Sequence, residues 1–252
     1  MNNTHSENVV YGVHAVTELV KERGEQVDHV YFDADKKSSL VFDLLKLCRK
    51  LRLTYQNVPG IKLDSIARTT KHQGVVAICS IKAYCDVETI MSAIAAKDLP
   101  GLLFVPASIE DPGNLGSLIR SCAAFGVDGV LLERKNTAPL GSTVAKSSAG
   151  MLEHLLVAKP RNLEGFIGEL KEKGYRVVGA LQGEALKPEQ VDFTGPTIIV
   201  TGGEHRDIPP YLLRLCDRVA GIPISGSAQS LNVTVAGSIL LYECARQRGF
   251  RF

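Results

Sequence analysis

The sequence lacks several features that would place it in large classes of protein. It has no run of about 18 apolar residues, so we expect no membrane-spanning helix. Residues 1–7 are polar and lack the apolar core of a secretion signal. The six cysteines are scattered without CxxC spacing, which disfavours a zinc site. We therefore expect a cytoplasmic protein with reduced thiols and no metal.

The usual nucleotide-binding patterns are also missing. The glycine-containing stretch 111–126 does not have the GxGxxG spacing, and no GK[ST] follows it, so neither a dinucleotide site nor a P-loop is supported. What remains is a globular composition, with 45% hydrophobic and 22% charged residues in a chain of 252. That length is enough to bury a core in one large domain or two modest ones.

Charge is distributed unevenly, although the net charge is only +2. Between residues 46 and 71 the single acid is Asp64, against a set of basic residues: Lys46, Arg49, Lys50, Arg52, Lys62, Arg68 and Lys71. A local excess of this kind is typical of surfaces that bind a phosphate backbone. A solvated helix face is the alternative, and charge alone does not separate the two.

The first part of the chain predicts a small α/β domain over residues 1–81. The patterns indicate helices at 11–23 and 39–51 and strands at 28–33 and 75–81. In the second helix we expect one inward face, formed by Leu40, Leu44, Leu47 and Leu51. Residues 82–100 are mixed and end in Lys-Asp-Leu-Pro-Gly, so we expect a linker there.

Residues 101–252 show a different pattern, in which short apolar strands alternate with helices. The expected strands are 102–106, 127–132, 176–181, 197–202 and 218–224. The expected helices are 114–125, 163–173, 209–216 and 230–247. This alternation predicts a parallel sheet covered on both faces, with ligands bound beyond the carboxyl ends of the strands.

Three motifs follow such strands. In the first, residues 111–126, a turn leads to Asn114, which opens a helix bearing Arg120. An arginine on a helix of small and apolar residues needs an anionic or carbonyl partner, and its planar fork suits phosphate. An internal salt bridge is the alternative. In the second, residues 198–209, Gly202 and Gly203 allow close backbone approach, and Glu204 offers a carboxylate that could hold an arginine or a polar group of a ligand. A plain turn at the end of a strand is the alternative.

The third motif, residues 222–237, runs from a strand into a helix start. We expect Ser230 to cap this helix and Leu231 and Asn232 to lie in its first turn, where free amides and a positive dipole end face a ligand. By itself the motif is compatible with an ordinary capped helix.

Together the three motifs resemble the SpoU/TrmH family of S-adenosylmethionine-dependent RNA 2′-O-ribose methyltransferases. They carry Asn-x-Gly-x₃-Arg, Gly-x-Glu and Ile-Pro…Ser-Leu-Asn-Val in the family's order, over residues 102–247. Residues 10–16 and 71–77 also resemble the small (L30e-like) substrate-binding domain of the branch that modifies a guanosine of 23S ribosomal RNA. The resemblance implies an α/β fold whose C-terminal domain is a trefoil-knotted (SPOUT) methyltransferase, and a homodimer formed through that domain.

The resemblance also implies roles for individual residues. The residues matching the methyl-transfer site are Asn114, Arg120, Glu204, Ser230 and Asn232. Those implied to bind the cofactor S-adenosylmethionine are Thr201, Gly202, Gly203, Ile222, Ile224, Ser230 and Leu231. In the N-terminal domain we expect RNA contacts from Arg49, Lys50, Arg52, Lys71 and His72. One departure is that His205-Arg206-Asp207 stands where family members often carry Gly-x-Gly.

The sequence leaves several functions open. The preferred one is methylation of a guanosine 2′-hydroxyl in 23S rRNA, and the nearer alternatives are tRNA or an rRNA adenosine. An RNA-binding assembly factor that has lost activity is the alternative from another class. Because a guanidinium is always charged, we expect Arg120 to anchor a phosphate and stabilise developing alkoxide charge rather than act as a simple base.

Overall fold

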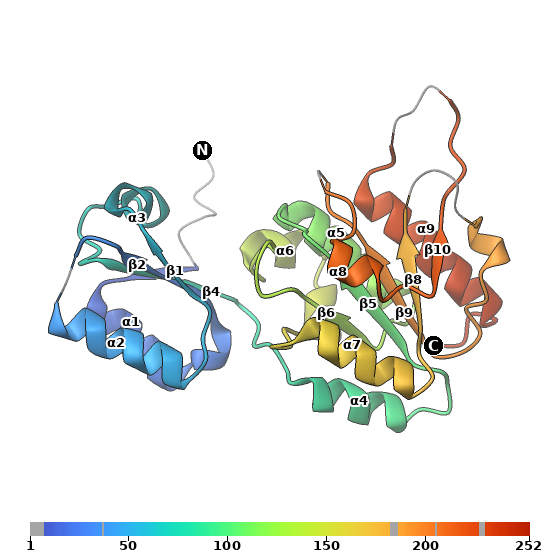
Figure 1. Cartoon of the computed structure of the whole chain (residues 1–252), viewed down its shortest axis with the longest axis horizontal. Coiled ribbons are helices and arrows are strands. Elements are labelled where there is room, and N and C mark those ends of the chain that lie inside the picture. The colour runs from blue at the N-terminus through green and yellow to red at the C-terminus, as the bar shows by residue number, and fades with distance from the viewer. Residues whose placement is uncertain (1–7, 37, 182–185, 205, 227–229) are drawn as a thin grey trace. The chain divides into compact units, whose positions relative to one another are not determined.

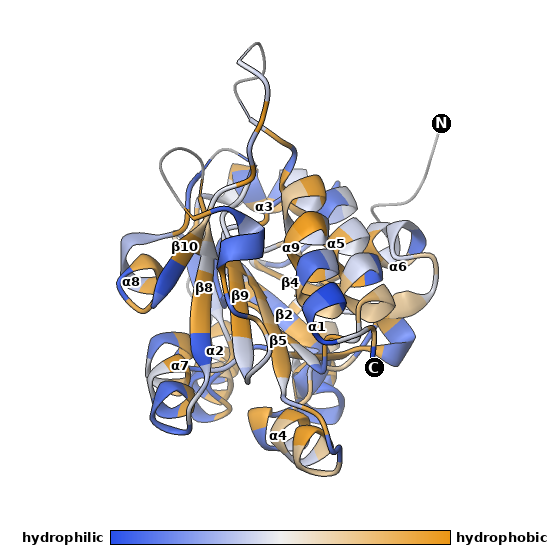
Figure 2. Ribbon diagram, turned by 90° about the vertical axis from the view of Figure 1, so that its right-hand side faces the viewer, coloured by the Kyte–Doolittle hydropathy of each residue, from blue (hydrophilic) through white to orange (hydrophobic). Residues whose placement is uncertain are grey.

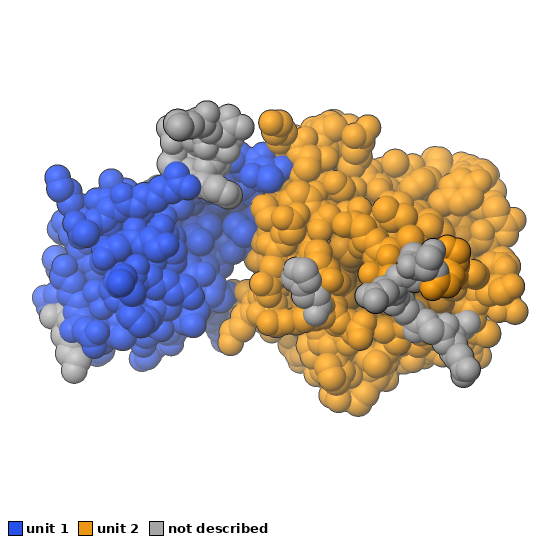
Figure 3. Space-filling view, turned by 90° about the horizontal axis from the view of Figure 1, so that it is seen from above, with its two compact units in different colours: residues 1–83, 139–143 blue, residues 84–138, 144–252 orange. Residues whose placement is uncertain are grey.

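The computed structural model describes the chain except residues 1–7, 37, 182–185, 205 and 227–229. It divides into two compact units (Figure 3). The first contains residues 1–83 and 139–143, and the second contains 84–138 and 144–252. In the described part of the chain, no helix is both long and apolar enough to cross a membrane.

The first unit is a four-stranded sheet with helices on both faces (Figure 1). The strand order is β1-β4-β2-β3, with only the β2–β3 pair parallel. The strands are β1 (Val9–Tyr11), β2 (Val27–Asp33), β3 (Tyr55–Val58) and β4 (Val75–Cys79). The helices are α1 (Val13–Glu22), the 3₁₀ turn η1 (Gly24–Gln26), α2 (Ser39–Lys50) and α3 (Gly60–Ala67). Helices α1 and α2 enclose the main core of this unit with Val30 and Phe32 of β2.

The expected inward face of α2 is correct for Leu44 and Leu47, which contact the core, and wrong for Leu40 and Leu51. The helix buries Val41, Leu44 and Cys48, whereas Leu40 and Leu51 are 50% and 42% exposed. Leucines and other apolar residues surround much of this helix, so more than one stripe has helical spacing. Packing against α1 and β2 selects the stripe that is rotated toward Val41.

The second unit is a six-stranded parallel sheet in the order β10-β8-β9-β5-β6-β7. Its strands are β5 (Leu102–Pro106), β6 (Gly129–Leu131), β7 (Leu156–Ala158), β8 (Arg176–Ala180), β9 (Thr197–Thr201) and β10 (Arg218–Ala220). Figure 2 shows β5, β8 and β9 as largely apolar segments. Such continuous apolar strands are expected where helices cover both faces of a sheet. The expected α/β class with a parallel C-terminal sheet is confirmed.

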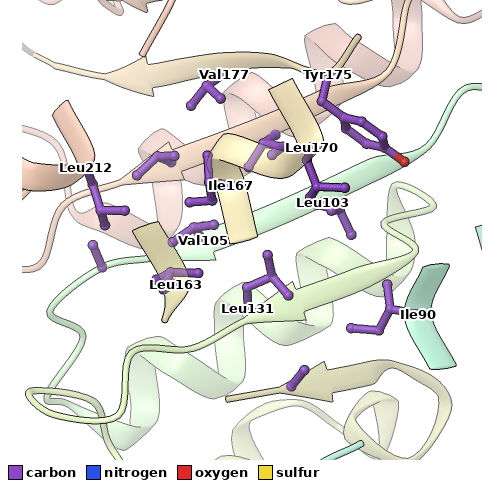
Figure 4. Close-up of a cluster of buried hydrophobic side chains, with 14 of the residues drawn as sticks. Ile90, Leu103, Val105, Leu131, Leu163, Ile167, Leu170, Tyr175, Val177 and Leu212 are labelled. Atoms are coloured by element: carbon purple, nitrogen blue, oxygen red, sulfur yellow. The ribbon is translucent and has the colours of Figure 1, made fainter. Parts of the chain in front are cut away.

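The remaining helices lie in the second unit, except that α6 begins in residues 139–143 of the first unit. They are α4 (Val87–Ala95), α5 (Pro112–Ala124), α6 (Ser142–Ser147), α7 (Leu163–Glu172), α8 (Pro210–Leu213) and α9 (Val233–Gln247). Single turns of 3₁₀ helix occur at η2 (Met151–His154) and η3 (Pro188–Gln190). Helix α7 covers one face, where Leu163, Ile167 and Leu170 meet Leu103 and Val105 of β5 (Figure 4). Helices α5 and α9 lie together, and Gly237 of α9 approaches Phe104 of β5.

The range 82–100, expected to be a linker, is largely part of the second unit. It forms α4, whose Asp86 cap accepts a hydrogen bond from the Thr89 amide at 2.8 Å. Ile90 and Ile94 are buried in the same core as α7. The apolar residues at this spacing therefore fold onto the sheet rather than span a gap. The expected trefoil knot stays a prediction, since 182–185 and 227–229 lie outside the described residues.

Candidate functional site

A cavity of about 390 Å³ lies where β8, β9 and β10 end, at Ala180, Thr201 and Ala220. This is the carboxyl edge of the parallel sheet, where the strand alternation predicts a ligand. All seven residues proposed to bind the cofactor line it: Thr201, Gly202, Gly203, Ile222, Ile224, Ser230 and Leu231. Glu204 and Asn232 line the same cavity. The second and third motifs therefore form one site, although residues 210–221 separate them in the sequence.

The loop after β9 has little room for side chains. The Gly203 amide donates to the Arg206 carbonyl at 2.7 Å, which folds the loop back on itself. A Cβ added to Gly203 would lie 2.2 Å from the carbonyl oxygen of Ser108, in the loop after β5. Because glycine has no side chain, a ligand beside this loop can contact its backbone amides and carbonyls directly. Arg206 and Asp207 line the cavity and add charge to its rim, while His205 lies outside the described residues.

Thr201 contributes a buried hydroxyl to this region. The residue is 1% exposed, and its Oγ1 has no hydrogen-bond partner within the part of the chain that the structure describes. A buried polar group left without a partner costs roughly 1–3 kcal/mol. Because Thr201 also lines the cavity, a bound ligand with a polar group at this depth would satisfy it.

Three polar side chains, one from each motif, form a hydrogen-bonded chain. Asn114 donates from Nδ2 to Glu204 Oε1 at 2.7 Å, and Asn232 donates from Nδ2 to Asn114 Oδ1 at 3.3 Å. The Asn232 Oδ1 accepts from the Thr234 amide at 2.7 Å, which fixes which end of its side chain faces Asn114. Each amide therefore has one orientation, and the chain points its donors toward the Glu204 carboxylate.

Two helices position this chain. Asp111 caps α5 and accepts from the Asn114 amide at 2.7 Å, so Asn114 lies in the first turn. About two turns further along, the hydroxyls of Ser121 and Ser238 meet at 2.7 Å, joining α5 to α9. A Cβ on Gly237 would lie 2.7 Å from Leu118, so the glycine permits this close packing. The helices run side by side with their first turns together, which brings Asn114 and Asn232 into contact.

The expected cap of α9 is wrong. The N-cap is Asn232, whose side chain accepts from the Thr234 amide, and the helix begins at Val233. Ser230 is exposed and Leu231 half-buried, and both precede the helix. Asn232 takes the cap, and its Oδ1 accepts hydrogen bonds from both the amide and the hydroxyl of Thr234.

Arg120 lies apart from the other site residues. It is exposed on α5, about 120° around the helix from Asn114. It makes no hydrogen bond or ion pair with the residues that the structure describes, so the internal salt bridge is not observed. Glu204, considered as a support for this arginine, bonds Asn114 instead. The guanidinium is therefore available to a ligand or to another chain.

Glu133 is a buried carboxylate that the sequence motifs did not reveal, and it holds the loop that packs against Gly203. Glu133, 9% exposed, accepts from the Ser108 amide at 2.6 Å and from the Tyr211 hydroxyl at 2.5 Å. Burial and the Glu133 carboxylate raise the pKa of Tyr211, so the phenol stays protonated and donates. Ser108 has φ +54° and its carbonyl packs against Gly203. Glu133 thus joins the loop after β5, which packs against Gly203, to helix α8. No local motif marks it, because both of its bonds are long-range.

The expected RNA contacts of the first unit have two different environments. Arg49, Lys50, Arg52 and Lys71 are exposed. His72, however, is 5% exposed and packed into a turn, so its proposed RNA contact is not supported. Its Nδ1 accepts from the Gly74 amide at 3.0 Å, and its Nε2 bonds an Asp64 oxygen at 2.9 Å. The histidine holds the turn before β4. Across the described residues, no His, Cys, Asp and Glu cluster suited to a metal ion is found.

Two family models match the chain, one for each unit. Residues 101–242 match the model described as the SpoU rRNA Methylase family. Residues 9–85 match the model described as RNA 2′-O ribose methyltransferase substrate binding. The two matches fall on the unit that contains the cavity and on the unit that contains the basic segment.

Similar proteins match over most of their length. A Staphylococcus saprophyticus protein whose name assigns it to the TrmH family of tRNA/rRNA methyltransferases is 32% identical over 242 residues, 96% of each chain. The SpoU methyltransferase AviRb from Streptomyces viridochromogenes, solved with AdoMet (S-adenosylmethionine), has TM-score 0.57 and 28% identity, covering 96% of this chain and 91% of its own. The TrmH/SpoU tRNA modifying enzyme of A. aeolicus has TM-score 0.55 and 27% identity, covering 65% and 83%.

Proposed function

The chain belongs to the SpoU/TrmH family of S-adenosylmethionine-dependent RNA methyltransferases, and we propose that it methylates a ribose 2′-hydroxyl, in a guanosine of 23S rRNA. The observation that carries the proposal is the meeting of three motifs. Asn114, Glu204 and Asn232 form one hydrogen-bonded chain, and two of them line the cavity. These are the polar residues that the family resemblance assigns to the methyl-transfer site.

The cavity has the chemistry to hold S-adenosylmethionine. Ile222, Ile224 and Leu231 provide apolar walls, and the loop at Gly202 and Gly203 provides closely approaching backbone. The unpartnered Thr201 hydroxyl offers a buried polar contact. Glu204 has no cationic partner among the described residues, so its negative charge complements a positively charged ligand. We assign the cofactor to these residues.

When bound, S-adenosylmethionine supplies a methyl group on a positively charged sulfur together with its own leaving group. The protein then has to orient the ribose hydroxyl and accommodate the proton that it loses. Asn114 and Asn232 hold Glu204 at the cavity rim, where its carboxylate can accept a hydrogen bond from the substrate. Arg120, always charged, anchors the neighbouring phosphate and stabilises developing negative charge on the ribose oxygen. Ser230, exposed at the rim, is assigned a contact with the substrate.

The proposed homodimer uses the outer face of α5 and α9. Val235 and Tyr242 are 46% and 50% exposed there, and the Tyr242 ring meets Phe125 and Phe250 at centroid distances of 6.0 and 5.8 Å. Exposed apolar surface of this kind is typical of interaction sites. Arg120 borders this face on α5, so dimerisation would put it at the interface. Sedimentation of Tyr242→Asp tests this: we expect monomers, and an unchanged oligomer would show that another surface is used.

The preference for 23S rRNA over tRNA rests on the first unit. It matches the substrate-binding model, and its segment 46–71 exposes cations suited to a phosphate backbone. The A. aeolicus tRNA modifying enzyme covers only 65% of this chain, a share close to that of the second unit alone. A larger RNA gives the additional domain something to bind. We place the reaction in the cytoplasm, where unmodified rRNA and the cofactor are both available.

Nucleotide-resolution mapping of 2′-O-methyl groups tests the proposal. RNA from cells with and without the protein is compared, and the affected transcript is then methylated by the purified enzyme. We expect one guanosine of 23S rRNA to lose its methyl group and to regain it in vitro. Loss at a tRNA or at an rRNA adenosine would correct the substrate, and no loss at any position would contradict the proposed activity.

A further inference from the structure

Helix α2 of the first unit presents an aromatic and cationic stripe to solvent. Phe42, Lys46 and Arg49 follow one another at intervals of four and three residues, so they share one side of the helix. Phe42 is 55% exposed, although a phenylalanine of this helix could have packed inward as Val41 and Leu44 do. The helix therefore leaves a large apolar side chain on its surface.

The stripe continues onto the edge strand β3. Arg49 donates from Nε to the Tyr55 hydroxyl at 3.0 Å, and its guanidinium lies 5.9 Å from the centre of the Tyr55 ring. The Lys46 ammonium lies 4.5 Å from the centre of the Phe42 ring. Cations and aromatic rings thus alternate along the surface. We call the set Phe42, Lys46, Arg49 and Tyr55 the α2 stripe.

Charge around the α2 stripe favours an anionic occupant. Lys50 and Arg52 are exposed at the end of the same helix. Asp43 is the acid of α2, and its pair with Lys46 is long at 3.7 Å, with side chains 69% and 61% exposed. An exposed ion pair of this kind contributes little to stability. The Lys46 ammonium can therefore leave Asp43 and the Phe42 ring for a stronger anion. A protein partner with an apolar surface would not need this cationic excess.

We propose that the α2 stripe binds single-stranded RNA, with one nucleobase stacked on Phe42 and flanking phosphates held by Lys46 and Arg49. Nucleobases stack on exposed aromatic rings in most single-strand binding surfaces, and cations beside the ring follow the backbone. The proposal rests on the proposed function, since it takes RNA to be the substrate. It adds a position and a mode of binding: an unpaired base is captured by the first unit.

The chain contains no tryptophan, which makes a direct test possible. Phe42→Trp in the full-length protein places a single indole in the α2 stripe. Leu40→Trp is the matched control, because Leu40 is 50% exposed on the same helix but on its opposite flank. The probes are an unmodified 23S rRNA transcript, a mixed 20-nucleotide single strand and its duplex. In the Phe42→Trp variant we expect the single strand and the transcript to quench the indole fluorescence strongly and the duplex to quench it weakly. The fluorescence of the Leu40→Trp control should change little with any of them.

Affinity measurements separate stacking from other contacts. Removing one base stack by Phe42→Ala should weaken single-strand binding roughly 5- to 150-fold without changing its salt dependence, because no charge is lost. Phe42→Leu keeps apolar bulk without an aromatic ring and should weaken binding similarly. Arg49→Gln should instead reduce the salt slope. Wild-type affinity in Phe42→Leu, or self-association that depends on Phe42, would overturn the proposal in favour of a protein contact.

The measurements distinguish failure of the stacking proposal from failure of the proposed function. Suppose that the enzyme binds and methylates RNA, but that the indole of the Phe42→Trp variant is quenched no more than that of the Leu40→Trp control. The stacking proposal is then wrong and the proposed function stands. If the wild-type protein neither binds nor methylates any of the RNA probes, both are wrong. Methylation by Phe42→Ala with a raised KM and an unchanged kcat would support a substrate-capture role.

Discussion

Replacing Gly203 with alanine tests how tightly the structure constrains the cavity loop. A Cβ at this position would lie 2.2 Å from the Ser108 carbonyl oxygen, whereas real Cβ contacts stay beyond 3.0 Å, so the loop must move by about 0.8 Å. Neither side yields easily. The Ser108 amide is bonded to Glu133 at 2.6 Å, and the Gly203 amide is bonded to the Arg206 carbonyl at 2.7 Å.

The expected cost follows from this displacement. Overpacking in a constrained region typically destabilises a protein by about 1–3 kcal/mol, which should lower Tm by several degrees without unfolding the chain. A misplacement of roughly 1 Å in a catalytic arrangement can cost about 10² in rate. Because the loop carries Glu204 and lines the cavity, we expect Gly203→Ala to lose about that factor in methyl transfer and to bind S-adenosylmethionine more weakly.

The assays are titration calorimetry with S-adenosylmethionine, transfer of a radiolabelled methyl group to RNA, and thermal unfolding. Gly195→Ala is the control, because nothing lies within 4 Å of its added Cβ and its φ is not positive. It should match the wild type in all three assays. A Gly203→Ala enzyme that stays folded with wild-type cofactor affinity and turnover would show that the loop is not confined by Ser108.

Three further predictions concern Arg120, Glu133 and the basic segment of the first unit. Arg120→Ala should lower single-turnover methylation by about 10²–10³ while cofactor affinity by calorimetry stays within a few-fold, and Arg120→Lys should not rescue it because lysine lacks the planar fork. Glu133→Ala should lower kcat because it removes the acceptor of two hydrogen bonds, from the Ser108 amide and the Tyr211 hydroxyl. The side-chain amide of Glu133→Gln can still accept from Ser108 and donate to the Tyr211 oxygen, so its kcat should exceed that of the alanine variant. Reversing Arg49, Lys50 and Arg52 to glutamate should weaken RNA binding and flatten its salt dependence, with cofactor affinity unchanged; equal affinity and slope would indicate a solvated helix face.

The second unit was predictable because its elements have clear periods. The strand expected at 102–106 coincides with β5, since a strand buried on both faces appears as a continuous apolar run. Strands β1, β3 and β7 were missed. Each has only three or four residues; the equally short β6 and β10 were found because they lie within the expected strands 127–132 and 218–224. The missed strands exist because a neighbouring strand supplies hydrogen bonds, and a pattern within the segment does not record that.

Helix faces and helix starts show a second limit. Around α2 several apolar stripes satisfy helical spacing, and the neighbours α1 and β2 select the one that includes Val41 and Cys48. At the start of α9, Ser230 and Asn232 are both good capping residues. Local propensity does not distinguish them, and the bonds to Thr234 decide in favour of Asn232.

The motifs predicted which polar residues of the candidate site come together, apart from Arg120, but not the hydrogen bonds between them. The motifs named Asn114, Glu204 and Asn232, and the structure joins them into one chain. Which residue supports Glu204 was misjudged, because an arginine is the usual partner of a carboxylate and an asparagine is less obvious. The sequence also gave no reason to connect Glu133 with the cavity, because its partners, Ser108 and Tyr211, are distant from it in the chain.

The hydrogen bond from Asn114 to Glu204 leaves the charges of Glu204 and Arg120 unpaired with each other. An arginine paired with Glu204 would offset the negative charge of the carboxylate. Asn114 fixes the carboxylate without neutralising it, because an amide donates a hydrogen bond but carries no charge. The cavity rim thereby keeps a negative group, which in the proposed function favours a cationic cofactor, and the exposed Arg120 of α5 is the residue that we propose for RNA. A polar but neutral residue of the first motif thus supports the carboxylate of the second motif without cancelling its charge.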